Sequence, residues 1–100
     1  MTTAIDDFNE TIHPPRRLFI CSFLASVDEA EFGTLRDAAG ISDSSLSKHL
    51  SALAGAGYVR ILKPTGRGRV RTWVALTSEG REAFASHRRA LQLVLGAISL

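Results

Sequence analysis

The side chains of this sequence that could do chemistry fall into two short stretches. The first stretch mixes hydroxyl, ammonium and imidazole groups, carried by Ser42, Ser44, Ser45, Ser47, Lys48 and His49. The second stretch is cationic and contains Lys63, Arg67, Arg69 and Arg71. Hydroxyl and ammonium groups hydrogen-bond base edges and phosphate oxygens, and clustered cations attract a polyanion. Together the two stretches indicate a surface that binds nucleic acid.

The alternatives for these side chains are an ordinary solvated polar face, catalysis and metal binding. A nucleophilic serine needs a partner base, and the serine-rich run at 42–51 has no obvious one. His13, His49 and His87 lie far apart in the sequence, and a lone cysteine without clustered carboxylates does not complete a zinc site. No glycine-rich loop joins a strand to a helix to hold a nucleotide. We therefore expect no enzyme activity, no metal site and no cofactor.

The composition fits one small domain. Of the 100 residues 45% are hydrophobic and 22% charged, which supports one core and no second module. No apolar run is long enough for a bilayer, and the opening Met1-Thr2-Thr3 leads into an acidic stretch rather than a signal peptide. Cys21 lies among apolar residues. We expect a cytoplasmic protein with a buried, reduced thiol.

The net charge of +2 is spread unevenly along the chain. Residues 1–33 carry two basic and six acidic side chains, whereas residues 34–80 carry seven basic and three acidic ones. Residues 81–100 carry three basic side chains and one acidic side chain. A basic middle after an acidic start indicates one face for a polyanion, not a uniformly cationic surface.

The hydroxyl-rich stretch falls on the second helix of a predicted helix-turn-helix. A first helix is expected from His13-Pro14-Pro15 to about Ser26, then a very short strand beginning at Phe32, then a helix at about 34–39. Gly40 suits the C-cap of that helix, and Ser42 suits the N-cap of the next one. A stripe recurs there at helical spacing, formed by Leu46, Leu50 and Leu53. We expect the helix-turn-helix at about 34–55.

The cationic stretch falls on a predicted hairpin. Residues 58–63 and 69–76 are expected to be strands, joined by a turn rich in glycine and proline, so that about 58–76 forms a basic wing. One or two charges protect a hairpin edge from aggregation, and four are more than that purpose needs. The surplus favours contacts to phosphate. Trp73 is expected in the core.

A long helix at about 78–98, capped by Thr77, is expected to end the sequence. Its heptad-like apolar stripe predicts a dimer interface formed by Phe84, Leu91, Val94, Leu95 and Ile98. The opening arm adds further apolar surface that a twofold partner could cover, from Ile5, Phe8 and Ile12. The alternative for this stripe is an intramolecular core helix.

Several stretches resemble one known group of proteins. Ile41–Leu50, with Leu53, Gly57, Tyr58 and Val59 after it, resembles the recognition-helix region of MarR-like and ArsR-like bacterial regulators. Residues 69–72 and 76–81 look like the return strand of their wing and the start of their last helix. The opening His13-Pro14-Pro15-Arg16 is similar to the start of the first core helix in a short branch of this superfamily. The match covers roughly residues 12–90.

The resemblance implies a mainly α fold with a small β-hairpin, that is, one winged helix-turn-helix domain over residues 1–100 with terminal dimerisation helices. It implies a homodimeric, cytoplasmic transcriptional regulator that binds double-stranded DNA at a pseudo-palindromic operator. The third helix would enter the major groove, and the wing would contact the backbone. The alternative function is a winged-helix module that binds another protein, which would show apolar patches in place of the basic wing.

The sequence departs from both families in their sensing parts. ArsR-like metal sensors often carry a cysteine pair near the recognition helix, and this chain has none there. MarR-like proteins usually have longer terminal helices that frame a ligand cavity, for which this chain has little material. The resemblance therefore extends to DNA binding and assigns no effector.

Overall fold

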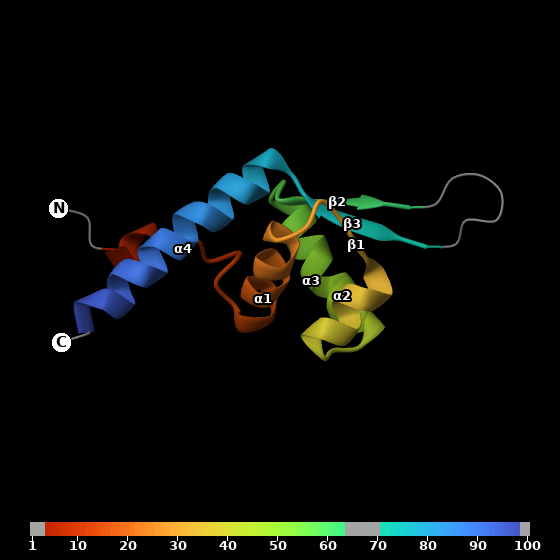
Figure 1. Cartoon of the computed structure of the whole chain (residues 1–100), viewed down its shortest axis with the longest axis horizontal. Coiled ribbons are helices and arrows are strands. Elements are labelled where there is room, and N and C mark those ends of the chain that lie inside the picture. Colours follow the sequence, from red (N-terminus) through yellow and green to blue (C-terminus); the bar gives the residue numbers. More distant parts are fainter. Residues whose placement is uncertain (1–3, 64–70, 99–100) are drawn as a thin grey trace.

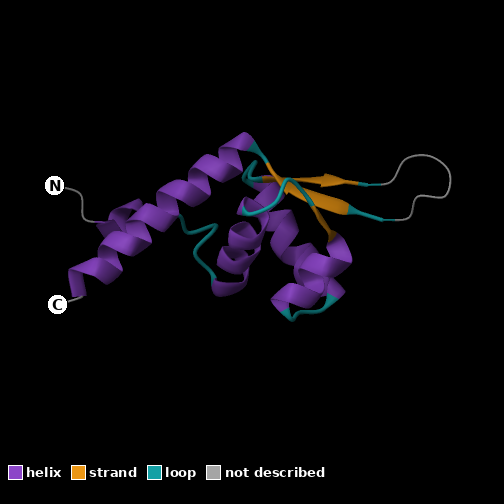
Figure 2. Cartoon of the chain, in the orientation of Figure 1, coloured by secondary structure: helices purple, strands orange, loops and turns teal. Residues whose placement is uncertain are grey.

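The computed structural model describes residues 4–63 and 71–98, with side chains up to Gly96. A short 3-10 helix, η1 (Ala4–Asp7), precedes four α-helices: α1 (Pro15–Ala25), α2 (Phe32–Ala39), α3 (Asp43–Gly55) and α4 (Ser78–Ile98). Three short strands lie between them: β1 (Ala30–Glu31), β2 (Val59–Leu62) and β3 (Trp73–Leu76). Helices dominate and the sheet is small (Figures 1 and 2), as the fold class predicted from the sequence requires.

The turn between α2 and α3 follows from local residue choices. Gly40 takes the left-handed conformation, with φ 67°, and its N–H donates to the Arg36 carbonyl at 3.0 Å. The Ser42 hydroxyl accepts the N–H of Ser45 at 3.1 Å, which caps α3. Leu46, Leu50 and Leu53 are all buried in the core. The predicted helix-turn-helix, its two caps and its leucine stripe are confirmed.

The sheet has one more strand than the predicted hairpin. Its order is β1-β3-β2, and both pairings are antiparallel, with Ala30 opposite Val74 and Ile61 opposite Val74 on its other side. The predicted strand start at Phe32 is wrong. The strand is Ala30–Glu31, and α2 begins at Phe32, two residues before the predicted Thr34. The N–H of Phe32 donates to the carbonyl of Thr72, the residue before β3, at 2.8 Å. The chain therefore passes from β1 into α2 without a connecting loop.

The wing strands are shorter than expected within the described residues. β2 and β3 pair over Val59–Leu62 and Trp73–Leu76, against predicted strands at 58–63 and 69–76. Trp73 is half-buried and does not join the core cluster, which corrects its predicted place in the core. Successive strand residues alternate between the faces of a sheet, and Val74 takes the core-facing position.

The core lies between α1, α2, α3 and the inner face of the sheet. It contains Ile20 and Leu24 of α1, Leu35 of α2 and the leucine stripe of α3. Cys21 is fully buried among them, and this burial raises the pKa of its thiol to about 11. The thiol is therefore protonated at neutral pH, as expected of an unreactive core cysteine.

A tight joint sets the direction of α4. The Thr77 hydroxyl accepts the N–H of Gly80 at 2.9 Å, which caps the helix, and donates to the Gly57 carbonyl at 2.6 Å. Gly80 packs so closely on Tyr58 that a Cβ there would overlap the Tyr58 carbonyl oxygen. Arg81 donates to the carbonyls of Ala25 at 3.3 Å and Val27 at 2.9 Å. The helix is thereby fixed to α1 and to the start of β2, and it extends away from the sheet (Figure 1).

The opening arm folds back on α4 within the same chain. Ile12 is fully buried, so it is not available to a partner subunit, contrary to the expectation for this residue. Phe8 packs on His13 and His87, with ring centroids 4.8 and 5.0 Å away, and Ile5 stays 60% exposed. The two histidines, treated as separate in the sequence, meet at 3.1 Å between Nδ1 of His13 and Nε2 of His87.

Candidate nucleic-acid interface

The helix α3 presents its polar side chains in three rows. Successive residues of an α-helix lie about 100° apart around its axis, so Lys48 stands midway between Ser47 and His49. Lys48 and Ser47 are exposed, and His49 is half-buried. The leucine stripe lies on the far side of the helix from Lys48. The exposed face of α3 therefore has Lys48 at its centre, with a hydroxyl row on one flank and His49 on the other.

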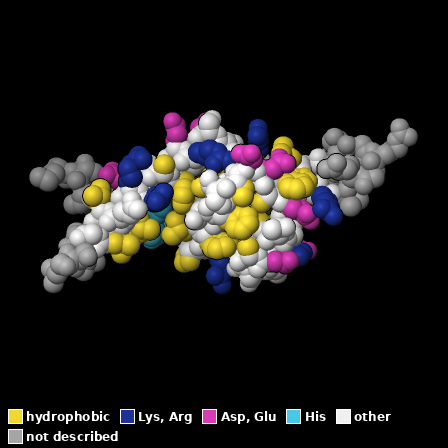
Figure 3. Space-filling model, in the orientation of Figure 1, with side chains coloured by type: hydrophobic (Ala, Val, Ile, Leu, Met, Phe, Trp, Pro, Cys, Tyr) yellow, Lys and Arg dark blue, Asp and Glu magenta, His cyan; other side chains and the backbone are white. Residues whose placement is uncertain are grey.

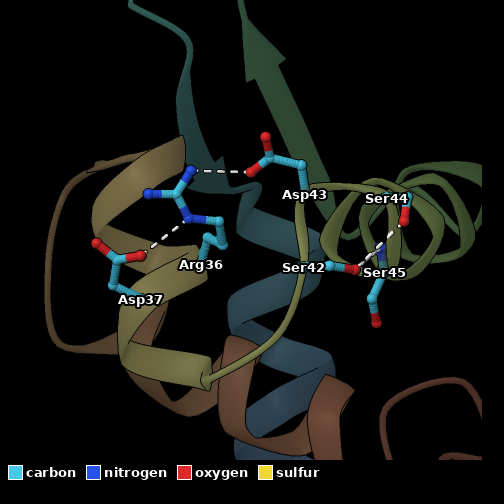
Figure 4. A network of polar contacts seen from close by, with 6 residues as sticks. All are labelled: Arg36, Asp37, Ser42, Asp43, Ser44 and Ser45. Atoms are coloured by element: carbon cyan, nitrogen blue, oxygen red, sulfur yellow. Dashed lines mark hydrogen bonds and ion pairs between the residues drawn. The ribbon is translucent and has the colours of Figure 1, made fainter.

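An ion pair with α2 holds Asp43, the acidic residue at the start of α3 (Figure 4). Arg36 of α2 donates to Asp37 and to Asp43, both at 2.9 Å. Hydrogen bonds and charge from the two carboxylates, those of Asp37 foremost, raise the pKa of Arg36 above its ordinary value. Beside this network the Ser42 and Ser44 hydroxyls lie 3.2 Å apart. The first turn of α3 thus presents hydroxyls and main-chain N–H groups beside the Asp43 carboxylate, which shares the single positive charge of Arg36 with Asp37.

One flank of α3 faces the wing across a hollow of about 400 Å³. Its polar lining consists of Ser47, Ser51, Lys63 and Thr72, and its apolar lining of Phe32, Leu50 and Ile61. Lys63 and Arg71 are exposed, and Nη1 of Arg71 lies 3.3 Å from the Glu31 carboxylate. Arg67 and Arg69, also predicted to contact DNA, lie outside the described residues.

The other flank of α3 faces the start of α1. His49 there has its pKa lowered by burial and then by the charges of Arg17, Arg16 and Lys48. Neither Arg16 nor Arg17 is among the predicted DNA-binding residues, because both belong to the acidic first third of the sequence. Their one local signal is that they are the two cations in that segment. In the structure α1 packs against α3, so the charges of these two arginines act on a predicted DNA-binding residue of another helix.

The comparisons with known proteins agree with this geometry. A family model described as a winged helix DNA-binding domain matches residues 16–95. The chain belongs to this family. An uncharacterized protein of Methanocaldococcus jannaschii is 32% identical over 71 residues, which cover 71% of this chain and 77% of that protein.

Two solved structures show the likeness of this winged helix protein in three dimensions. A transcriptional regulator homologue from Pyrococcus horikoshii OT3 is similar with a TM-score of 0.86 and 26% identity, over 92% of this chain and 91% of that one. NadR in complex with 4-hydroxyphenylacetate is similar with a TM-score of 0.73 and 27% identity, over 95% and 67% of the two chains. The resemblance to winged helix regulators seen in the sequence is confirmed.

The predicted dimerisation residues lie along α4 in different surroundings. Phe84 and Leu91 line a groove of about 540 Å³ between α1 and α4, and Phe84 packs against the core. Val94 is half-buried and Leu95 is 59% exposed. The side chain of Ile98 falls outside the described ones. The sequence analysis did not select Leu93, which is 64% exposed.

Two kinds of feature are absent from the described part of this winged helix protein. Over the described residues, no three His, Cys, Asp or Glu side chains gather where they could hold a metal ion. No helix in the described part of the chain has the length and apolar character needed to cross a bilayer.

Proposed function

We propose that this winged helix protein is a homodimeric transcriptional regulator that reads a pseudo-palindromic operator, with α3 in the major groove and the wing on the backbone. The observation that carries the proposal is the exposed face of α3. Lys48 stands at its centre between rows of hydroxyl and imidazole side chains, directly opposite a fully buried leucine stripe. An α-helix about 10–12 Å across fits the major groove, which is about 12 Å wide.

The residues of α3 would contact different parts of the DNA, according to the length and position of their side chains. Ser44, Ser45 and Lys48 project from its first turns, the part that a recognition helix presents to base edges. Lys48 combines length with charge, so it can bind either a guanine edge or a phosphate. The hydroxyls of Ser42 and Ser47 lie at the edges of this face, where sugar and phosphate groups pass.

The wing would hold the backbone on one side of α3. Lys63 and Arg71 are exposed beside the hollow that separates the wing from α3, and Arg67 and Arg69 belong to the same stretch of sequence. Cations so placed bind phosphates without distinguishing bases. We therefore assign affinity to the wing and specificity to α3.

The dimer would form through the end of α4. Leu95 is 59% exposed and continues the line of Phe84 and Leu91 beyond the groove against α1. Because the joint at Thr77, Gly80 and Arg81 fixes α4 to the rest of the domain, pairing two such helices would hold two copies of α3 at one separation. Half-sites centred about 10 base pairs apart, or a multiple of that, would match such a dimer.

Binding-site selection on random duplexes at fixed salt tests this proposal. The wild type should enrich a motif with two related half-sites. Lys48→Ala should lose about 1–3 kcal/mol of discrimination at particular base pairs. Lys63→Ala is the matched control on the wing, and it should weaken all sequences alike and reduce the salt slope of log K by about one.

Two results would contradict the proposal. An identical motif for Lys48→Ala and the wild type would remove Lys48 from base reading. The absence of any enriched motif for the wild type would refute sequence-specific binding and favour the protein-binding alternative.

A further inference from the structure

We infer that Arg16, Arg17 and His49 form a second phosphate-binding site, which holds the DNA strand on the side of α3 opposite to the wing. This inference rests on the proposed function, because it requires α3 to lie in the major groove. It assigns a binding role to two residues of α1, a helix outside the helix-turn-helix and the wing.

The first step is the arrangement around α3. Ser47 and Ser51 line the hollow shared with Lys63 and Thr72, so they mark the wing side of the helix. His49 follows Ser47 by two residues and therefore lies about 200° further around the axis. The helix α1 packs against α3 and lies on the side of α3 away from the wing strands (Figure 1). The charges of Arg17 and Arg16, at the start of α1, help to lower the pKa of His49, in agreement with this arrangement. Figure 1 shows α1 beginning on the same, lower side of the molecule as the turn between α2 and α3.

The second step is the shape of the major groove. A helix that fills a groove about 12 Å wide has a sugar-phosphate strand along each side. On the wing side the cations come from the hairpin. On the other side α3 itself offers Ser45 and His49, and the full positive charges come from α1. The two walls of the groove would then each meet cations held on a separate element.

The cations on and beside this side of α3 form no ion pairs with acidic side chains among the described residues. Within the described part of the chain, Arg16, Arg17 and Lys48 form no ion pair, although Arg36 and Arg71 do. Arg17 is held by a hydrogen bond from Nη1 to the Thr11 carbonyl at 3.1 Å, and its buried Nε has no hydrogen-bond partner among the described residues. Arg16 is exposed. Unpaired like charges repel one another, and a bound phosphate would relieve that repulsion.

The site would also link DNA binding to proton uptake. In the free protein, burial and the charges of Arg17, Arg16 and Lys48 lower the pKa of His49, so its imidazole is neutral at pH 7. A phosphate against the ring would favour the imidazolium and raise the pKa in the complex. Affinity should therefore increase as the pH falls through the raised value. A purely structural histidine would not cause this dependence.

The experiment measures the affinity of the full chain for a selected operator duplex and for an unrelated duplex of equal length, over series of salt and pH. Arg16→Gln should weaken both duplexes by roughly tenfold at 0.1 M salt and lower the salt slope by about one per subunit. His49→Gln should abolish the part of the pH dependence between about pH 8 and 5.5 that the site causes. Arg89→Gln removes an exposed cation on α4, away from the predicted dimer stripe, and should change neither slope nor pH dependence.

The outcomes separate this inference from the proposed function. If the wild type binds its operator but Arg16→Gln keeps the full salt slope, the second phosphate site is refuted and the proposed function stands. Unchanged pH dependence in His49→Gln would also refute it. Wild-type protein that binds neither duplex would overturn the proposed function itself. Thermal unfolding of each variant at the wild-type temperature excludes loss of fold as the cause.

Discussion

The two ends of the molecule contain the same kind of helix and expose opposite kinds of surface. Both α3 and α4 bury one apolar row in the chain, but α3 shows solvent hydroxyls and cations, whereas α4 beyond α1 shows leucines. Figure 3 shows hydrophobic side chains along the lower edge of the arm that α4 forms, and also over the middle of the molecule. A polar face with unpaired cations is complementary to DNA, and an exposed apolar face is complementary to another apolar face.

Burial alone does not distinguish the roles of the two helices. Both helices bury apolar side chains within the same chain. The leucine stripe of α3 lies in the core, and α4 packs Phe84 against that core and lines the groove beside α1 with Phe84 and Leu91. The two helices differ in the side chains that they expose. Opposite its leucine stripe α3 exposes Lys48, whereas α4 exposes Leu95 on the continuation of its own apolar stripe. A substitution in one of these two regions leaves the other unchanged, so the properties of the two regions can be compared in the same variant.

The largest effect is expected at the apolar end. Leu95→Asp should convert a dimer into a folded monomer and weaken operator binding at least about a hundredfold, because one particle no longer engages two half-sites. Leu93→Asp is the matched control: Leu93 is similarly exposed but lies about 200° around α4 from Leu95, off the predicted stripe. Light scattering and operator titration measure the two properties. A monomeric wild type at micromolar concentration, or equal disruption by Leu93→Asp, would contradict the dimer interface.

A smaller effect is expected when the caps of the two helices are removed. Ser42→Ala should cost about 1 kcal/mol in the free energy of unfolding, since one N-cap bond is lost. Thr77→Ala should cost about 2 kcal/mol, because its hydroxyl both caps α4 and donates to the Gly57 carbonyl. Urea denaturation measures both variants. Equal costs would show that the Thr77–Gly57 bond adds nothing to the joint.

The smallest effect is expected from mild acid at the α4 end. The backbone N–H of Asn9 donates to Nδ1 of His87 at 3.0 Å, so the proton of neutral His87 lies on Nε2 and points to Nδ1 of His13. Burial and then the charge of His13 lower the pKa of His87, although Glu10 opposes this shift. Below about pH 6.5 the unfolded chain therefore binds more protons than the folded one, and stability falls with pH.

The acid effect can be isolated with a glutamine at position 87. His87→Gln keeps an acceptor and a donor but does not titrate, so urea unfolding between pH 8 and 5.5 should lose less stability than in the wild type. Because pH 5.5 lies only about one unit below the ordinary pKa of histidine, the expected difference stays below about 1.4 kcal/mol. Identical pH dependence in the two proteins would show that His87 is not responsible. The histidine at the DNA-binding end, His49, is present in both and cancels in the comparison.

The candidate site could be predicted from the sequence where its features are local. Gly40, Ser42 and the leucine stripe interact over a few residues, and each stood in the position that its chemistry requires. The same holds for Thr77 at the start of α4. Helical spacing and capping span one or two turns of chain, so residue order alone contains them.

Residue order is therefore enough to predict the helices, their caps and the polar face of α3, because these depend on neighbours along the chain. Which residues far apart in the sequence come into contact depends on how the elements pack together. The packing joined His13 to His87, added β1 to β3 and turned Trp73 away from the core. It also packed α1 against α3, so that the charges of Arg16 and Arg17 act on His49. Those contacts arise when helices and strands pack to bury their apolar faces, and no local pattern specifies which polar residues at the edges of that packing will meet.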